Sequence, residues 1–314
     1  MSKQKFSLKN TEQVRTTTTM QMQKNIKKMY EQLYKDVSKK IKQFGDKGVQ
    51  KQNLILLQRE IKRRIEQINK DLQNGIVRNM NTVCIEVVKD KRAFLKQCGF
   101  KDSEIKNAFY YIPERVVNNI INGNIYQDGW TLSGAIWGYN KQVQDKLNKI
   151  ISIGVAQGKS AKEIAMDLEQ YVNPSVRKPS KTIQSWRYDK YGNKIKDSVY
   201  FGKIDYNAMR LARTLISHAY QQSFEMVNKN DPFVVGYRWI TSNFHGRVCD
   251  ICRDREGKIF KKDELPIDHP NGMCTFEAVI PYSMKDIATK IGEWYLSPLG
   301  TFPDIDKYAL DFME

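Results

Sequence analysis

The stretch MQKNIKKMYEQLYKDVSKKIKQF, residues 22–44, decides the fold class of this 314-residue chain. Its apolar side chains recur at steps of three and four residues, as they do along one stripe of an amphipathic helix. The stripe consists of Met22, Ile26, Met29, Tyr30, Leu33, Val37, Ile41 and Phe44. The sequence therefore predicts a long helix at this point and a mainly α protein.

A second apolar stripe follows after a break that contains two glycines, Gly45-Asp-Lys-Gly48. Its residues have near-heptad spacing and are Leu54, Leu57, Ile61, Ile65, Ile68 and Leu72. Two such stripes joined by a short polar turn favour an antiparallel helical hairpin. Gly75 is expected to end the second helix, and the β-branched run Thr16–Thr19 is expected to form an extended arm before the first.

The positive charge of the chain is concentrated in its N-terminal third. Residues 1–110 hold 25 Lys and Arg against 11 Asp and Glu, whereas the formal charge of the whole chain is +17. Such a field attracts polyanions, most commonly nucleic acid, although an acidic protein surface or a solvated helix face gives the same composition. Aromatic residues are not interleaved among the basic ones, so we expect non-specific contacts to the DNA backbone and not to bases. The candidate residues are Lys27, Lys28, Lys35, Lys39, Lys40, Arg59, Lys62, Arg63 and Arg64.

The remaining sequence indicates three consecutive domains. A turn-rich connection, residues 122–129, separates a basic helical domain, residues 1–125, from a helical middle domain, residues 126–235. In the middle domain Ser160 and Glu163 have the spacing of a capping box, and residues 186–195 alternate as in a β-hairpin. A long helix follows that carries His218, a lone histidine expected to be structural. Residues 236–314 form the last domain.

This last domain begins with a cluster of metal-ligand residues. Three of the five cysteines and one of the three histidines lie between Cys249 and Cys274, in the order Cys249-x-x-Cys252, His269 and Cys274. Thiolates and imidazole favour Zn²⁺, and four protein ligands close a tetrahedral site, so the predicted role is structural. Unmetallated packed thiols and a redox pair are the alternatives. Short apolar runs flank the cluster and predict a small zinc-knuckle-like β element packed on the long helix, within an α+β fold.

Targeting signals are not visible in the sequence. No run approaches 18 consecutive apolar residues, and the first residues have no apolar segment behind their charges. We therefore expect neither a membrane span nor a secretory signal, and a reducing compartment in which Cys84 and Cys98 act as buried small hydrophobic residues.

The order of motifs from Gly158 to Pro281 resembles the Mu F-like minor head proteins of tailed bacteriophages, also called head morphogenesis proteins. Members of that family share a Gly-x-Ser-x-x-Glu-Ile-Ala helix start, an Ala-Arg-Thr helix, a Trp-containing strand, a Cys-x-x-Cys pair with following Gly and Phe, and a His-Pro-Asn-Cys-Arg-Cys signature. The matching positions here are 158–165, 212–214, 237–239, 249–252, Gly257, Phe260 and 269–274.

Two positions depart from the family pattern. Gly272 replaces the first cysteine of the family's final signature and Met273 replaces its arginine, which removes one thiolate that zinc would use. The aspartate usually found before the Cys-x-x-Cys pair is also replaced, by a stretch that contains His245, which is a possible substitute ligand.

The resemblance implies a non-enzymatic minor head (capsid) protein of a tailed bacteriophage. Such a virion component acts in head morphogenesis and capsid assembly near the portal vertex. It is made in the host cytoplasm and retained in the capsid interior, with the portal protein, capsid or scaffold components and packaged DNA as partners and no membrane during assembly. The alternative is a zinc-supported DNA nuclease, or another DNA-processing enzyme, in which His245 or His269 activates water. The aspartate beside the histidine would be Asp250, Asp254 or Asp268.

Overall fold

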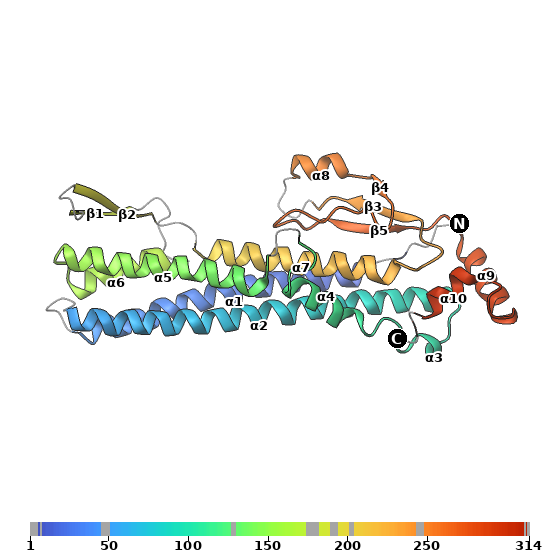
Figure 1. The fold of residues 1–314 in the computed structure, drawn as a ribbon, viewed down its shortest axis with the longest axis horizontal. Helices are drawn as coiled ribbons and strands as arrows, with labels where there is room; N and C mark the ends of the chain where they lie inside the picture. Colours follow the sequence, from blue (N-terminus) through green and yellow to red (C-terminus); the bar gives the residue numbers. More distant parts are fainter. Residues whose placement is uncertain are drawn as a thin grey trace. The chain divides into compact units, whose positions relative to one another are not determined.

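The computed structural model describes residues 6, 8–44, 51–126, 130–173, 182–188, 194–200, 204–242, 248–310 and 312. The protein is mainly helical and carries two small antiparallel sheets, as the α+β prediction requires. The helices are α1 (Lys9–Lys42), α2 (Lys51–Gln97), α3 (Asp102–Ile105), α4 (Ile112–Ile121), α5 (Leu132–Ala156), α6 (Ala161–Val172), α7 (Ile204–Asn228), α8 (Asp250–Arg255), α9 (Met284–Leu296) and α10 (Pro303–Leu310). The strands are β1 (Thr182–Tyr188), β2 (Lys194–Tyr200), β3 (Gly236–Ile240), β4 (Ile259–Phe260) and β5 (Thr275–Val279) (Figure 1).

The chain forms two compact units from interleaved segments. Unit 1 comprises residues 1–20, 76–129 and 211–314, and unit 2 comprises residues 21–75 and 130–210. The helices α1, α2 and α7 each contribute residues to both units. Division into the three consecutive domains 1–125, 126–235 and 236–314 stays a prediction. Among the described residues, no helix is both long and apolar enough to cross a membrane.

The predicted helical hairpin is present, but both of its helices are longer than the sequence indicated. In unit 2 the Asp36 carboxylate lies 3.2 Å from Arg64 Nη1, and in unit 1 Asp90 accepts hydrogen bonds from Thr11, so α1 and α2 run antiparallel. The prediction that Gly75 ends the second helix is wrong, since α2 continues to Gln97. A Cβ atom at Gly75 would lie 2.9 Å from Met22 Cε, so close packing, not helix termination, explains the glycine.

The prediction of an extended arm at Thr16–Thr19 is also wrong, because α1 begins at Lys9 and includes it. The buried face of α1 continues toward the N-terminus through polar residues, Thr11, Arg15 and Thr19. The Asp90 carboxylate accepts the Thr11 backbone N–H at 3.0 Å and the Thr11 hydroxyl at 2.7 Å. A carboxylate at a helix N-terminus pairs with free N–H groups and with the positive end of the helix dipole, which stabilises the helix start.

Unit 2 has an apolar core formed by its segments of α1 and α2 together with α5 and α6. The stripe residues Ile26, Leu33 and Ile41 of α1 are fully buried, as predicted. The predicted capping box is present at the start of α6, where the Ser160 hydroxyl accepts the Glu163 backbone N–H at 3.3 Å. The predicted β-hairpin is also confirmed, because β1 and β2 pair antiparallel; its turn lies outside the described residues.

Unit 1 contains the sheet β4-β3-β5, in which both strand pairs are antiparallel (Figure 1). Its inner face is aromatic and packs on α7, as predicted for the β element. The Phe224 ring of α7 lies 5.0 Å from the Tyr237 ring and 5.9 Å from the Phe276 ring, and Trp239 lies 5.1 Å from Phe276. These rings hold the sheet, and with it the loops that carry the cysteine cluster, against one long helix.

The C-terminal segment packs within unit 1. The Phe312 ring lies 5.2 Å from the Phe100 ring and 5.8 Å from the Phe109 ring. Tyr308 is buried, and Trp294 donates its indole N–H to Asp306 at 2.8 Å. Its aromatic residues therefore contribute mainly to the core.

Candidate functional site

The four predicted metal ligands come from two neighbouring parts of the β element. Cys249 precedes α8 and accepts the backbone N–H of Cys252, which lies inside that helix, at 3.4 Å. His269 and Cys274 both lie in the segment between β4 and β5, with Cys274 directly before β5. Pairing of β4 and β5 with β3 brings these segments together.

The ligand atoms are in contact. His269 Nε2 lies 3.2 Å from Cys249 Sγ and 3.1 Å from Cys252 Sγ, and Cys252 Sγ lies 3.3 Å from Cys274 Sγ. A Zn–S bond of about 2.3 Å separates tetrahedral ligand atoms by about 3.8 Å, so small side-chain shifts would open these contacts around an ion. The structure thus places the predicted ligands within metal-binding distance, in two groups of three that share Cys252: Cys249, Cys252 and His269, and Cys252, Asp268 and Cys274.

Asp268, which the sequence indicated only as a partner of His269 in the nuclease alternative, is also a member of the cluster. It is buried, and its carboxylate accepts the backbone N–H of His269 at 2.9 Å and that of Cys274 at 3.1 Å. A Cβ atom at Gly272 would lie 2.2 Å from Asp268 Oδ2. The aspartate therefore fills the space that a side chain at position 272 would need, which explains why glycine is accommodated there. The Asp268-His269 step was the available signal.

The loop that carries His269 and Cys274 is bonded to α7. Arg213 Nη1 donates to Asn271 Oδ1 at 2.8 Å, the backbone N–H of Asn271 donates to Thr214 Oγ1 at 2.7 Å, and Ser217 Oγ donates to the Gly272 carbonyl at 2.8 Å. Asn271 has a φ of 71°, a conformation that asparagine tolerates better than most residues. The Ala-Arg-Thr segment and the His-Pro-Asn segment therefore form one hydrogen-bonded unit.

His218 lies one turn further along α7, and contacts at both of its ring nitrogens favour the predicted structural role. Its Nε2 lies 2.9 Å from the Asp268 carbonyl and its Nδ1 lies 2.8 Å from Tyr126 Oη. The carbonyl can only accept, so Nε2 carries the proton and Nδ1 accepts from the tyrosine. Burial lowers the pKa of His218, which keeps the ring neutral.

Arg15 of α1 supports the same loop from a distant part of the sequence. Its Nη1 donates to the Cys274 carbonyl at 2.9 Å and its Nη2 to the Met273 carbonyl at 3.0 Å. The guanidinium carbon lies 4.2 Å from the centre of the Tyr220 ring, and the side chain is buried. A planar fork with two donors fits adjacent carbonyls, so Arg15 fixes the backbone on either side of the Cys274 thiol.

Burial governs the protonation of the two inner thiols. It is the main cause that raises the pKa of Cys252, and neighbouring Cys274 adds to the effect. Burial also raises the pKa of Cys274, followed by the negative charge of Asp268. Since metal ligation requires thiolates, a cation must provide the charge compensation that this buried site otherwise lacks. His245 lies outside the described residues.

The nine basic residues predicted to contact DNA all lie on the α1 and α2 segments of unit 2. Most are exposed, but two of them already have acidic partners. Arg63 Nη2 lies 2.7 Å from Glu60, and Arg64 lies 2.8 Å from Glu60 and 3.2 Å from Asp36. The surface available for a polyanion is therefore weighted toward the lysines of α1.

Comparisons of this chain with protein-family models, with curated proteins and with solved structures gave no match.

Proposed function

We propose that this chain is a minor head protein of a tailed bacteriophage that acts near the portal in head morphogenesis and contacts packaged DNA through its basic helical segments. The observation that supports this most directly is the bonding of the Ala-Arg-Thr segment to the His-Pro-Asn segment. Arg213 and Thr214 both contact Asn271. The resemblance rests on separate short motifs, and motifs that build one local structure carry more weight than motifs that merely occur in order.

We infer that the cluster binds one structural Zn²⁺ through Cys249, Cys252, His269 and Cys274. Three thiol groups and an imidazole are a donor set that zinc favours, and every ligand contacts at least one other. Asp268 lies beside Cys252 and Cys274, and its carboxylate accepts the backbone N–H groups of His269 and Cys274, which orients these two ligands. Bound zinc would hold α8 to the loop before β5.

The proposed role is not enzymatic. In the nuclease alternative, His269 beside Asp268 would activate water. However, His269 Nε2 faces two sulfur atoms, and the Asp268 carboxylate is buried and occupied by two backbone N–H groups. A general base needs a free position toward the attacking water, which this arrangement does not favour.

The zinc proposal is tested by the metal content of freshly reduced protein, measured by plasma emission spectroscopy. We expect about one zinc per chain in the unaltered protein, and loss of that zinc in Cys249→Ser, because the site would keep only three of its ligands. Cys98→Ala is the matched control, since that thiol is buried in the same unit and outside the cluster. Zinc-free unaltered protein, or equal zinc in Cys249→Ser, would refute the metal site.

The head-protein proposal is tested by cosedimentation with oligomers of the portal protein encoded by the same genome. We expect the chain to sediment with portal oligomers and to be present in purified virions. A chain that neither sediments with the portal nor occurs in virions contradicts the proposal. Cleavage of DNA that is lost in His269→Ala would instead support the enzyme alternative.

A further inference from the structure

The exposed side of α1 in unit 2 carries five lysines on one face, Lys24, Lys28, Lys35, Lys39 and Lys42, here called the lysine stripe. Steps of four, seven, four and three residues keep them on one side of a helix with 3.6 residues per turn. All five are exposed, and the opposite side of the helix carries the buried apolar stripe. At about 1.5 Å of rise per residue, the lysine stripe extends over about 27 Å.

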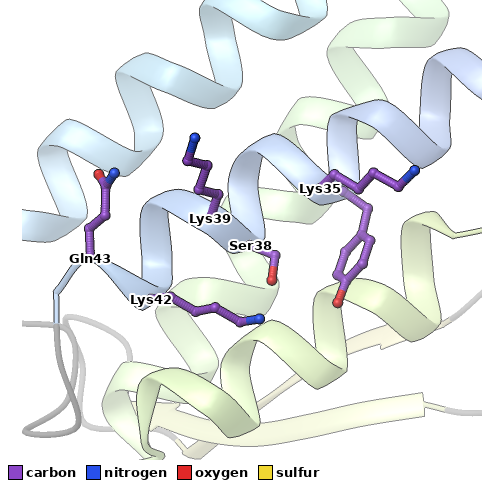
Figure 2. A pocket seen from close by; sticks show the side chains of 6 residues that line it. Lys35, Ser38, Lys39, Lys42 and Gln43 are labelled. Atoms are coloured by element: carbon purple, nitrogen blue, oxygen red, sulfur yellow. The ribbon is translucent and has the colours of Figure 1, made fainter.

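Two adjoining cavities open at the C-terminal end of the lysine stripe, with volumes of about 450 and 360 Å³. They share Tyr34, Ser38 and Lys42. The larger is completed by Lys35, Lys39 and Gln43, and the smaller by Ala161, Lys162, Ala165 and Met166 of α6. Figure 2 shows the Ser38 hydroxyl and the Lys42 ammonium on the same side of α1, toward α6. The Lys42 ammonium and the Ser38 hydroxyl thus lie on the α6 side of α1, whereas the Lys39 side chain extends from the other side of the helix in this view (Figure 2).

The charge at this opening is not compensated by ion pairs. Within the described part of the chain, no ion pair involves a lysine of the stripe or Lys162. Of the acids nearby, Asp36 pairs with Arg64 and Asp167 pairs with Lys159. Glu31 lies on the same side of α1 as the stripe, three residues after Lys28 and four before Lys35. Burial raises the pKa of the Tyr34 hydroxyl, the hydrogen bond with Ser38 partly opposes the increase, and the nearby Glu169 carboxylate, which also bonds this hydroxyl, adds to it. Among the described residues that line the two cavities, four are lysines and none is acidic.

We propose that the lysine stripe binds successive phosphates of one nucleic-acid strand and that the two cavities receive a phosphate at its end. This inference rests on the DNA contact of the proposed function and specifies where that contact occurs. It adds Lys24, Lys42 and Lys162, the Ser38 hydroxyl and the Tyr34 hydroxyl to the predicted surface, and it assigns no contact to Arg63 or Arg64. Lysine, serine and tyrosine are common donors to backbone phosphates. A row of charges about 27 Å long fits an extended polyanion better than a small phosphate compound.

The test measures the affinity of the full-length chain for a fluorescent random-sequence DNA duplex by anisotropy across a series of salt concentrations. Lys35→Gln/Lys42→Gln removes two charges from the stripe and the cavity. Lys70→Gln/Lys146→Gln is the charge-matched control, because both residues are exposed in unit 2 and lie outside the stripe. We expect the first variant to bind at least about tenfold more weakly, with a salt slope lower by about 2. The control should lose less than about threefold, since it changes only the overall charge.

A second variant, Ser38→Ala/Tyr34→Phe, removes two hydroxyl donors without a change of charge. We expect weaker binding with an unaltered salt slope, because neutral donors displace no counterions. Equal losses in the two charge variants would overturn the stripe while leaving DNA contact in place. No binding of DNA by the unaltered chain would remove the DNA contact itself. Binding to anionic lipid vesicles but not to the duplex would also overturn the inference.

Discussion

The helix α1 buries different kinds of side chain in its unit 1 segment and in its unit 2 segment. In unit 2 the buried face of α1 is apolar, with Ile26, Leu33 and Ile41 at its centre. In unit 1 the same face carries Thr11 and Arg15, which bond to Asp90 and to the carbonyls of Met273 and Cys274. Apolar contacts depend mainly on volume, whereas buried polar contacts depend on direction and on the presence of each partner.

This difference indicates which unit specifies the site. Polar contacts in unit 1 fix individual backbone groups beside the cysteine cluster, and unit 2 presents lysines on a helix that its apolar core supports. The free energy of unfolding of unit 1 should therefore fall even when a substitution conserves charge. That of unit 2 should fall mainly when a substitution changes side-chain volume.

The largest effect is expected for Lys91→Met in unit 1. Lys91 is fully buried; its Nζ lies 2.5 Å from Asp231 Oδ2 and 2.8 Å from Asn228 Oδ1, beside the rings of Phe6, Phe94 and Tyr308. Loss of the ammonium leaves the buried Asp231 carboxylate without its counter-ion, so we expect a loss of about 4 kcal/mol in the free energy of unfolding, measured by urea denaturation.

The double variant Lys91→Met/Asp231→Asn removes both charges and should lose less than Lys91→Met alone. Lys89→Met is the control on the same helix, because the Lys89–Glu86 ion pair is exposed and contributes little. A loss in Lys91→Met no greater than that in Lys89→Met would show that the buried pair does not stabilise unit 1.

The next effect concerns the apolar core of unit 2. Ile26 is fully buried, so Ile26→Ala should cost about 3 kcal/mol in the free energy of unfolding, whereas Ile26→Val should cost about 1 kcal/mol. Lys91→Arg, equally conservative in charge, should cost more than Ile26→Val because the larger guanidinium cannot occupy the ammonium site. If Lys91→Arg costs no more free energy of unfolding than Ile26→Val, the proposed difference between the two units is refuted.

Sequence reasoning succeeded where burial is apolar. Spacing alone predicted the stripe of α1, and the motif at Ser160 and Glu163 predicted the start of α6, because both signals are local. It failed at Thr16–Thr19 because the residues that continue the buried face there are polar. The helix start before this run is stabilised by the bonds of Thr11 to Asp90, which lies on α2, so no local pattern contains this partner.

In the candidate site, too, only the residues with a local sequence signal were predictable. Cysteine and histidine spacing identified four ligands that the structure brings together, because the chemistry of the residue types is itself the signal. Arg15 was not predictable, since its role depends on carbonyl groups of Met273 and Cys274 far along the chain. Asp268 was adjacent to a ligand in sequence, but its inward orientation follows from the bonds of its carboxylate to backbone N–H groups.

A smaller effect is expected for Arg15→Lys, which keeps the charge and removes the fork. A lysine cannot donate to both carbonyls in the same geometry, so the loss should be about 2 kcal/mol in the free energy of unfolding. The rate of zinc transfer to a chelator should rise, because the Cys274 backbone is no longer held on both sides. Lys39→Arg, at an exposed position on the unit 2 part of the same helix, is the control and should leave both measurements unchanged. Equal chelation rates for Arg15→Lys and the unaltered protein would contradict the assignment of Arg15 to the cluster.

An effect of similar size, present only at higher pH, tests whether burial in unit 1 also governs the titration of a carboxyl group, Glu225. Burial raises the pKa of Glu225 to about 7, and the hydrogen bond from Gln221 Nε2, at 2.9 Å, partly opposes the increase. The folded state therefore binds more protons than the unfolded state between about pH 4.5 and pH 7, so this group makes stability fall as pH rises through that window. Above pH 7 the ionised Glu225 carboxylate lowers the free energy of unfolding by a constant amount, about 2 kcal/mol after allowance for partial solvent exposure.

Glu225→Gln removes the charge and keeps a side-chain oxygen that can accept from Gln221. The variant should therefore match the unaltered protein at pH 4.5 and exceed its free energy of unfolding by about 2 kcal/mol at pH 8. The difference between the two proteins isolates this residue from His218, whose lowered pKa makes stability fall in the opposite direction, as pH decreases. A difference that is the same at pH 4.5 and pH 8 would mean that Glu225 is solvated well enough to ionise freely. The dependence of unit 1 on the geometry of its polar contacts would then be limited to its hydrogen bonds and to the Lys91–Asp231 pair.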